Sequence, residues 1–130
     1  MKFEILTAWG RFIMQPANDV GKWHGKQWRL CNELAFEFNG SLYVVPLGFV
    51  TDGASIPRIY RWRFSPLGQW VRAATIHDWI YRTPDVAISR HDADKIFFAA
   101  MKQDSVSRWT RNVMYRAVQL FGRSSYKARK

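Results

Sequence analysis

Residues 28 to 38 alternate between apolar and polar side chains, the period-two pattern of a strand with one buried face. The apolar positions of one parity are Trp28, Leu30, Leu34, Phe36 and Phe38. Asn39-Gly40 follows, a dipeptide that tolerates positive φ at both positions of a tight turn, and SLYVVPLGFV then reads as a partner strand. A two-residue turn predicts the pairs Phe38–Ser41, Phe36–Tyr43 and Leu34–Val45, all on one face. The pattern therefore predicts a β-hairpin, with Pro46 at an edge or at the end of the ladder.

The segments before this hairpin carry weaker signals. Residues 3–6 and 11–14 are predicted as short strands, and residues 15–27 as a loop. Residues 51–65 are predicted as a connection that begins with turn residues.

Three helices are predicted in the second half of the chain. The first has Ser65 as N-cap and Pro66 at its first position, and it runs to about Arg82. The second has Ser89 as N-cap with Asp92 three residues on, a loose capping box.

The third helix is expected from about Ser107 to Phe121, with Gly122 as its stop. Apolar residues recur at helical spacing in the second and third helices, so each has one face for the core. The predicted stripe of the second helix is Ala93, Ile96, Phe97, Ala100 and Met101. The predicted inward positions of the third are Trp109, Val113, Ala117, Leu120 and Phe121.

These elements predict an α+β fold, with an N-terminal antiparallel β-hairpin or small sheet packed on a C-terminal bundle of three helices. A length of 130 residues favours one domain. Its parts are a β-rich segment 1–50, a helical segment 65–122 and a basic tail 123–130.

Composition narrows the class of protein. Seven Trp, nine Phe and five Tyr supply bulky core material, and the lone Cys31 suits a reducing compartment. The N-terminus does not read as a signal peptide, and no apolar run approaches the roughly 20 residues of a membrane span. The net charge is +10, with no acid after Asp104. This asymmetry favours an anionic partner: nucleic acid, anionic lipid or an acidic protein surface. No nucleic-acid-binding module is evident, so specific nucleic-acid recognition is not expected.

Candidate chemistry centres on the first predicted helix. Its stripe is Trp70, Ala73, Ala74, His77 and Tyr81. A titratable histidine in an apolar stripe needs a polar partner, and Tyr81 lies one turn away. Two short antiparallel helices would bring Asp94 to the ring of His77. In this interpretation His77 is a general base, Asp94 fixes its tautomer and Tyr81 braces it.

Asp78 is rotated by roughly 100° from His77 and is predicted as an oxygen ligand for a hard cation such as Ca²⁺. The loop Thr51-Asp52-Gly53-Ala54-Ser55 would complete the shell, with Gly53 free to present carbonyls and Asp52 as a further ligand or a turn residue. The cation would polarise an ester carbonyl.

Two other interpretations stay open. His77, Asp78 and Asp94 can form a structural polar network in the core, without turnover. Alternatively, His77-Asp78 and His91-Asp92 can bind a transition metal in the manner of HD phosphohydrolases, although Asp92 is more simply a helix-capping residue.

Four segments, FVTDGASIPR, AATIHDWIYR, DADKIFFAAM and MYRAVQLFGRSSY, resemble a family of uncharacterised phage and prophage proteins, a domain of unknown function. The likeness runs from about residue 30 to the end of the chain. It implies a phage or prophage origin, often near virion or tail genes, and no established activity. The expected location is the host cytoplasm on synthesis, and incorporation into the virion is left open.

The helical half is similar to phospholipase A2, particularly the disulfide-free type in parvovirus capsids. The likeness covers about residues 70–121 and lies in Ala73-Ala74, His77-Asp78, Tyr81, Ala93-Asp94 and Phe97. It implies His77 as base, Asp78 as calcium ligand, and Tyr81 and Asp94 as supports of the histidine. The glycine-rich calcium loop of those enzymes is not clearly matched, and LGF at 47–49 and TDGAS at 51–55 are the nearest segments.

Two functions follow as hypotheses. One is a Ca²⁺-dependent phospholipid esterase with a phospholipase A2-like site. The other is a non-catalytic virion, tail or assembly protein on the same scaffold, whose Arg58, Arg61, Arg63 and basic C-terminus contact an acidic surface. Whether the protein is an enzyme therefore stays open from the sequence.

Overall fold

The computed structural model describes residues 1–16, 28–51 and 69–121. The chain divides into two compact units, Met1–Asp52 and Gly53–Lys130, each of which is described by itself.

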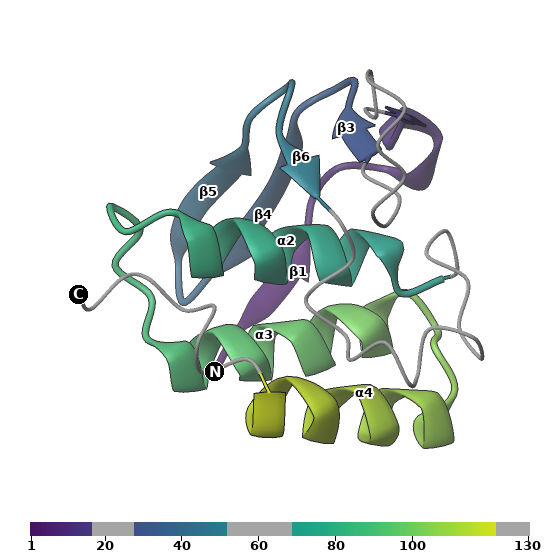
Figure 1. Ribbon diagram of the computed structural model, residues 1–130. Helices are drawn as coiled ribbons and strands as arrows, with labels where there is room; N and C mark the ends of the chain where they lie inside the picture. The colour runs from purple at the N-terminus through teal and green to yellow at the C-terminus, as the bar shows by residue number, and fades with distance from the viewer. Residues whose placement is uncertain (17–27, 52–68, 122–130) are drawn as a thin grey trace. The chain divides into compact units, whose positions relative to one another are not determined.

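The first unit holds two three-stranded antiparallel sheets (Figure 1). One has the order β1-β4-β5, formed by Phe3–Ile5, Leu34–Phe38 and Ser41–Val45. The other has the order β2-β3-β6, formed by Met14–Pro16, Trp28–Leu30 and Val50–Thr51. A short 3-10 helix, η1, spans Trp9–Arg11.

The hairpin of β4 and β5 is confirmed in turn and register. Asn39 and Gly40 have φ of 50° and 85°, the left-handed values that a two-residue hairpin turn requires. The predicted pairs are those observed: Leu34 with Val45, Phe36 with Tyr43, and Phe38 with Ser41. The strand β5 ends at Val45, directly before Pro46, which has no N–H to continue the ladder.

The prediction of one alternating strand over residues 28–38 is wrong, because that segment supplies two strands to two different sheets. Residues 31–33 bend between β3 and β4. At this bend the side chain of Asn32 donates from Nδ2 to the carbonyl of Arg11 at 2.9 Å. The strand predicted over residues 11–14 is also shifted, since Arg11 belongs to η1 and β2 begins at Met14.

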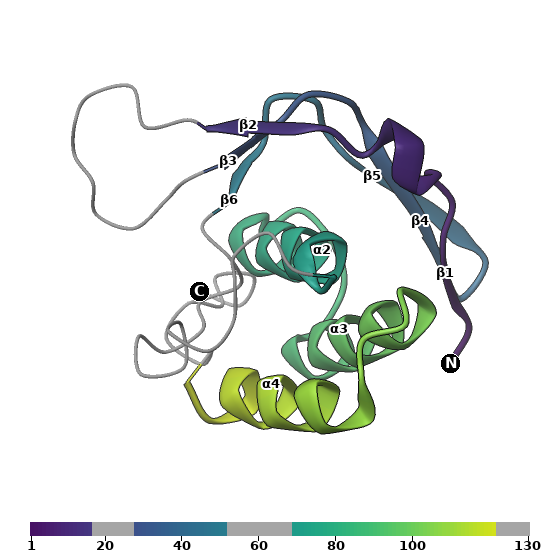
Figure 2. The same ribbon diagram turned by 90° about the vertical axis from the view of Figure 1, so that its right-hand side faces the viewer.

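The second unit holds three described helices, and α3 lies between α2 and α4 (Figures 1 and 2). Their bounds are Val71–Arg82 for α2, Arg90–Gln103 for α3 and Arg108–Phe121 for α4. The predicted cap Ser65 lies outside the described residues. Gln69 and Trp70 form a turn, so the predicted helix start is too early.

Every residue of α2 from Val71 to Asp78 is buried. The polar side chains among them therefore need hydrogen-bond partners inside the protein. Thr75 Oγ1 donates to the carbonyl of Val71 at 2.7 Å. Arg72 forms a bidentate ion pair with Asp104, with Nη2–Oδ1 and Nε–Oδ2 distances of 2.6 and 3.0 Å. This pair ties the first turn of α2 to the C-cap of α3.

The ends of α3 have specific caps. The Ser89 hydroxyl accepts from the N–H of Asp92 at 3.1 Å, so the predicted N-cap is confirmed. At the other end Ser105 takes a left-handed φ of 62°, and the N–H of Val106 donates to the carbonyl of Met101 at 2.9 Å. Both features close the last turn of the helix. The predicted stripe of this helix, from Ala93 to Met101, is buried.

The predicted inward face of α4 is partly wrong. Met114, Ala117 and Val118 are buried, whereas Trp109 is 58% and Leu120 73% exposed. The buried face is therefore turned by about one residue step, roughly 100°, from the predicted one. Periodicity gives the helix an apolar stripe but does not specify which part of it a neighbouring helix covers.

The architecture is α+β, with N-terminal strands and C-terminal helices, as predicted. No helix among the described residues is both long and apolar enough to span a bilayer.

Candidate functional site

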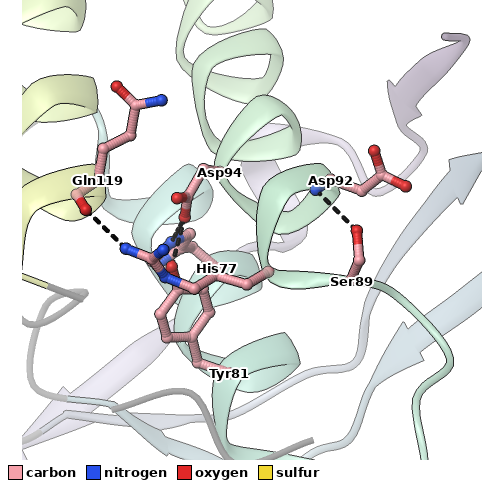
Figure 3. A network of polar contacts seen from close by, with 7 residues as sticks. His77, Tyr81, Ser89, Asp92, Asp94 and Gln119 are labelled. Atoms are coloured by element: carbon pink, nitrogen blue, oxygen red, sulfur yellow. Dashed lines mark hydrogen bonds and ion pairs between the residues drawn. The ribbon is translucent and has the colours of Figure 1, made fainter. Parts of the chain in front are cut away.

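The imidazole of His77 and the carboxylate of Asp94 meet between α2 and α3. His77 Nε2 lies 2.8 Å from Asp94 Oδ1 (Figure 3). Both residues are buried, at 1% and 3% exposure. The predicted approach of Asp94 to the ring is thus present. A carboxylate can only accept, so Nε2 carries the proton in this bond and Nδ1 of the neutral ring has a lone pair.

Tyr81 completes the contact from one turn further along α2. Its hydroxyl donates to the same oxygen, Asp94 Oδ1, at 2.5 Å. Burial raises the pKa of Tyr81 above its ordinary value of 10.0, and the hydrogen bond and charge of Asp94 raise it further. Tyr81 is therefore a neutral donor across the physiological range.

Aromatic rings fix the orientation of the imidazole. The ring centroids of Tyr81 and Phe97 lie 4.1 and 4.9 Å from that of His77. The remaining ring nitrogen, Nδ1, is buried and has no hydrogen-bond partner among the described residues. A buried polar atom in this state needs water or a ligand. We call His77, Asp94 and Tyr81 the histidine triad.

Arg90 adds a positive charge beside the triad, and the sequence interpretation did not include it. Its guanidinium interacts with Tyr81 and lowers the pKa of that hydroxyl, against the larger raising effects. Nη2 also donates to the carbonyl of Gln119, near the end of α4, at 2.6 Å (Figure 3). Its spacing in the sequence could have indicated this position, because Arg90 precedes Asp94 by four residues and so lies on the same side of α3.

Asp78 is buried, and its Oδ1 lies 3.3 Å from Nε of Arg82, one turn along the same helix. Asp52 and Gly53, the other predicted calcium ligands, lie outside the described residues. Of the nearest loop candidates, residues 47–49 belong to the first unit, where Gly48 donates to the carbonyl of Leu30.

The described residues hold no group of three or more His, Cys, Asp or Glu side chains arranged to bind a metal ion. This argues against the metal site of His77, Asp78, His91 and Asp92, since all four are described. His91 is exposed, and Asp92 lies in the first turn of α3, where Ser89 caps its N–H. Asp92 has the capping position that its place in the sequence suggested.

Fold and site together define an α+β protein with a histidine triad buried between two antiparallel helices. The chain belongs to the family described as "Protein of unknown function (DUF1353)", which matches residues 28–118. The matched segment covers more than half of the chain, so membership of an uncharacterised family is confirmed, and it includes the triad.

The chain is also similar to a curated protein, "Uncharacterized protein y4jT" of Sinorhizobium fredii. The two are 34% identical over 87 residues, which are 65% of this chain and 25% of that protein. The chain therefore spans about a quarter of the length of this relative. No solved structure matches the chain significantly. Phage origin and likeness to phospholipase A2 stay predictions.

Proposed function

We propose that the protein is a hydrolase that uses His77 as a general base to split a carboxylic ester of a phospholipid. The observation that carries the proposal is the asymmetry of the imidazole. Nε2 is held by Asp94, whereas Nδ1 is buried without a partner among the described residues. A histidine with one nitrogen anchored by a carboxylate and a lone pair on the other nitrogen has the arrangement of a general base.

In the proposed step, Nδ1 takes a proton from a water molecule as the water oxygen attacks the ester carbonyl carbon. The acyl C–O bond then breaks, and the proton passes to the departing alkoxide. The products are a fatty acid and an alcohol, the lysophospholipid. Asp94 stabilises the imidazolium that forms, because the carboxylate already accepts from Nε2.

Tyr81 and Arg90 support this step without touching substrate. The Tyr81 hydroxyl, held neutral by its raised pKa, keeps Asp94 Oδ1 in place for Nε2. Arg90 adds a positive charge beside the Tyr81 hydroxyl of the triad. The likeness of the motif to phospholipase A2 supports an ester of a phospholipid as the substrate class, and the net charge of +10 supports an anionic surface.

Calcium belongs to the proposal as the group that would polarise the ester carbonyl, with Asp78 as its ligand. Ca²⁺ takes about six to eight oxygen ligands. The described residues supply one fitting carboxylate, and Arg82 lies against it. This set alone does not make a calcium site, so no step of the mechanism runs through the ion.

The test is fatty acid release by the purified protein from mixed phospholipid vesicles, with added Ca²⁺ or with EGTA. We expect release by the wild type and a loss of at least about a hundredfold in His77→Asn, the usual size of a general-base effect. His91→Asn is the matched control, because His91 is an exposed histidine on the neighbouring helix. Equal release by wild type and His77→Asn would end the proposal. Equal release in Ca²⁺ and in EGTA would remove only the calcium part.

A second candidate is a non-catalytic phage virion, tail or assembly protein in which the triad only stabilises the fold. The burial of His77 to 1% exposure favours it. On this account, vesicles release no fatty acid, His77→Ala lowers the free energy of unfolding, and deletion of residues 123–130 blocks assembly. Normal assembly without those residues would contradict it.

A further inference from the structure

The outer face of α4 combines exposed apolar and basic side chains. Trp109 and Leu120 are 58% and 73% exposed, although such large apolar residues are usually covered. They lie at nearly the same angle around the helix, because 11 residues make about three turns. Val113, which is half-buried, lies between them on this face. Among the described elements α4 packs on α3, and the buried residues Met114, Ala117 and Val118 lie on a different face of the helix.

Charge on this face has one sign. Arg108 and Arg116 are exposed, and at 100° per residue both lie on the same side of the apolar line, together with the neutral Asn112 and Gln119. The chain has no acid after Asp104, so no carboxylate of α4 compensates these arginines. We call Arg108, Trp109, Asn112, Val113, Arg116 and Leu120 the α4 face.

An exposed tryptophan and leucine with arginines on one side of them fit the boundary between lipid headgroups and acyl chains. The apolar groups enter the acyl region, the indole lies at headgroup level and the guanidinium groups bind lipid phosphates. The line from Trp109 to Leu120 is about 16 Å long at 1.5 Å per residue. A helix of this length lies along an interface, and it is too short to cross a bilayer.

We infer that the α4 face is the surface by which the protein docks on an anionic phospholipid bilayer. The inference rests on the proposed function for its partner, since a phospholipid esterase has to meet its substrate at a membrane surface. The docking itself needs no turnover, so it is measured separately from hydrolysis.

The test is flotation of the full-length protein with vesicles of phosphatidylcholine alone or with added phosphatidylglycerol. We expect binding to the anionic vesicles and little to the neutral ones. Reversal of two charges in Arg108→Glu/Arg116→Glu should weaken binding by roughly thirtyfold or more, because each basic residue near the surface contributes about fivefold. Leu120→Gln should weaken it by about fivefold.

Two matched variants control for charge and hydrophobicity. Lys95→Glu changes an exposed basic residue of α3, and Leu42→Gln changes a leucine that is 63% exposed on β5. Each should bind anionic vesicles within about twofold of the wild type, and circular dichroism should show every variant folded. A loss in Lys95→Glu as large as the loss per arginine would overturn the inference, since charge alone would then explain the binding.

Two further arms separate other outcomes. If Arg108→Glu/Arg116→Glu weakens binding to a DNA oligonucleotide while Leu120→Gln leaves vesicle binding unchanged, the face binds nucleic acid and the inference is wrong. His77→Asn should bind vesicles as the wild type does. If the wild-type protein binds vesicles but releases no fatty acid, the proposed hydrolysis is wrong and the docking surface is supported. If the wild type releases fatty acid and Arg108→Glu/Arg116→Glu binds vesicles as tightly as the wild type, the docking surface is wrong and the proposed hydrolysis is supported.

Discussion

At the scale of single residues, one carboxylate oxygen organises the candidate site. Asp94 Oδ1 accepts from both His77 and Tyr81, at 2.8 and 2.5 Å. The sequence predicted these three residues as a group because His77 and Tyr81 are four apart and Asp94 lies on the next helix. It did not predict Arg90, because a charged residue at a helix start is ordinarily exposed to solvent.

Tyr81→Phe removes one of the two donors to Asp94. We expect a loss of about 1.5 to 3 kcal/mol in the free energy of unfolding near neutral pH, the usual range for a hydrogen bond to a charged group. The raised pKa of Tyr81 also sets a pH dependence. Below pH 10.0 the tyrosine is protonated in both states and its contribution is complete. Above it the unfolded state loses the proton first, so stability falls by up to about 1.4 kcal/mol per pH unit.

Urea unfolding of wild type and Tyr81→Phe, from about pH 7 to 11, checks this prediction. The stability difference between the two proteins should narrow as the pH rises above 10. Tyr43→Phe, at a half-buried tyrosine of the other unit, is measured beside it as the matched substitution. A difference between wild type and Tyr81→Phe that stays constant over the whole range would contradict the raised pKa.

At the scale of elements, the hairpin turn and the cap of α3 could be predicted, whereas the bend between β3 and β4 and the buried face of α4 could not. Asn39-Gly40 and Ser89 act through bonds within a few residues, so the hairpin and the start of α3 could be predicted. At the bend between β3 and β4, Asn32 bonds to Arg11, 21 residues away, a contact that the local sequence does not reveal. The exposed face of α4 likewise depends on where α3 packs, which periodicity alone does not specify.

The ion pair of Arg72 and Asp104 is another long-range contact that the sequence did not reveal. It is buried, with side-chain exposures of 4% and 1%. Arg72→Met should cost about 3 to 5 kcal/mol in the free energy of unfolding, since it leaves the carboxylate of Asp104 buried without that partner. Arg72→Met combined with Asp104→Leu should recover part of the loss, because both charges are then gone.

Chemical denaturation of the single and double variants measures these differences. Lys95→Met, at an exposed position of α3, should change stability by less than about 0.5 kcal/mol. A loss of under about 1 kcal/mol in Arg72→Met would show that the pair does not hold α2 to the end of α3.

At the scale of the whole molecule, the α+β class could be predicted because strand and helix periodicities occupy different halves of the chain. The single-domain organisation over 1–130 stays a prediction. The triad could be predicted because it lies on α2 and α3, which are adjacent in sequence and in space. The predicted calcium ligands Asp52 and Gly53 lie outside the described residues, so the calcium part of the site stays a prediction.

The central claim is that Asp94 holds Nε2 of His77 and leaves Nδ1 as a base. ¹⁵N NMR of histidine-labelled protein, at a pH where the ring is neutral, measures this directly, and His77→Asn assigns the signal. We expect the proton on Nε2 and an unprotonated Nδ1, with a weakened preference for this tautomer in Asp94→Asn. A neutral His77 ring with its proton on Nδ1 would contradict the account.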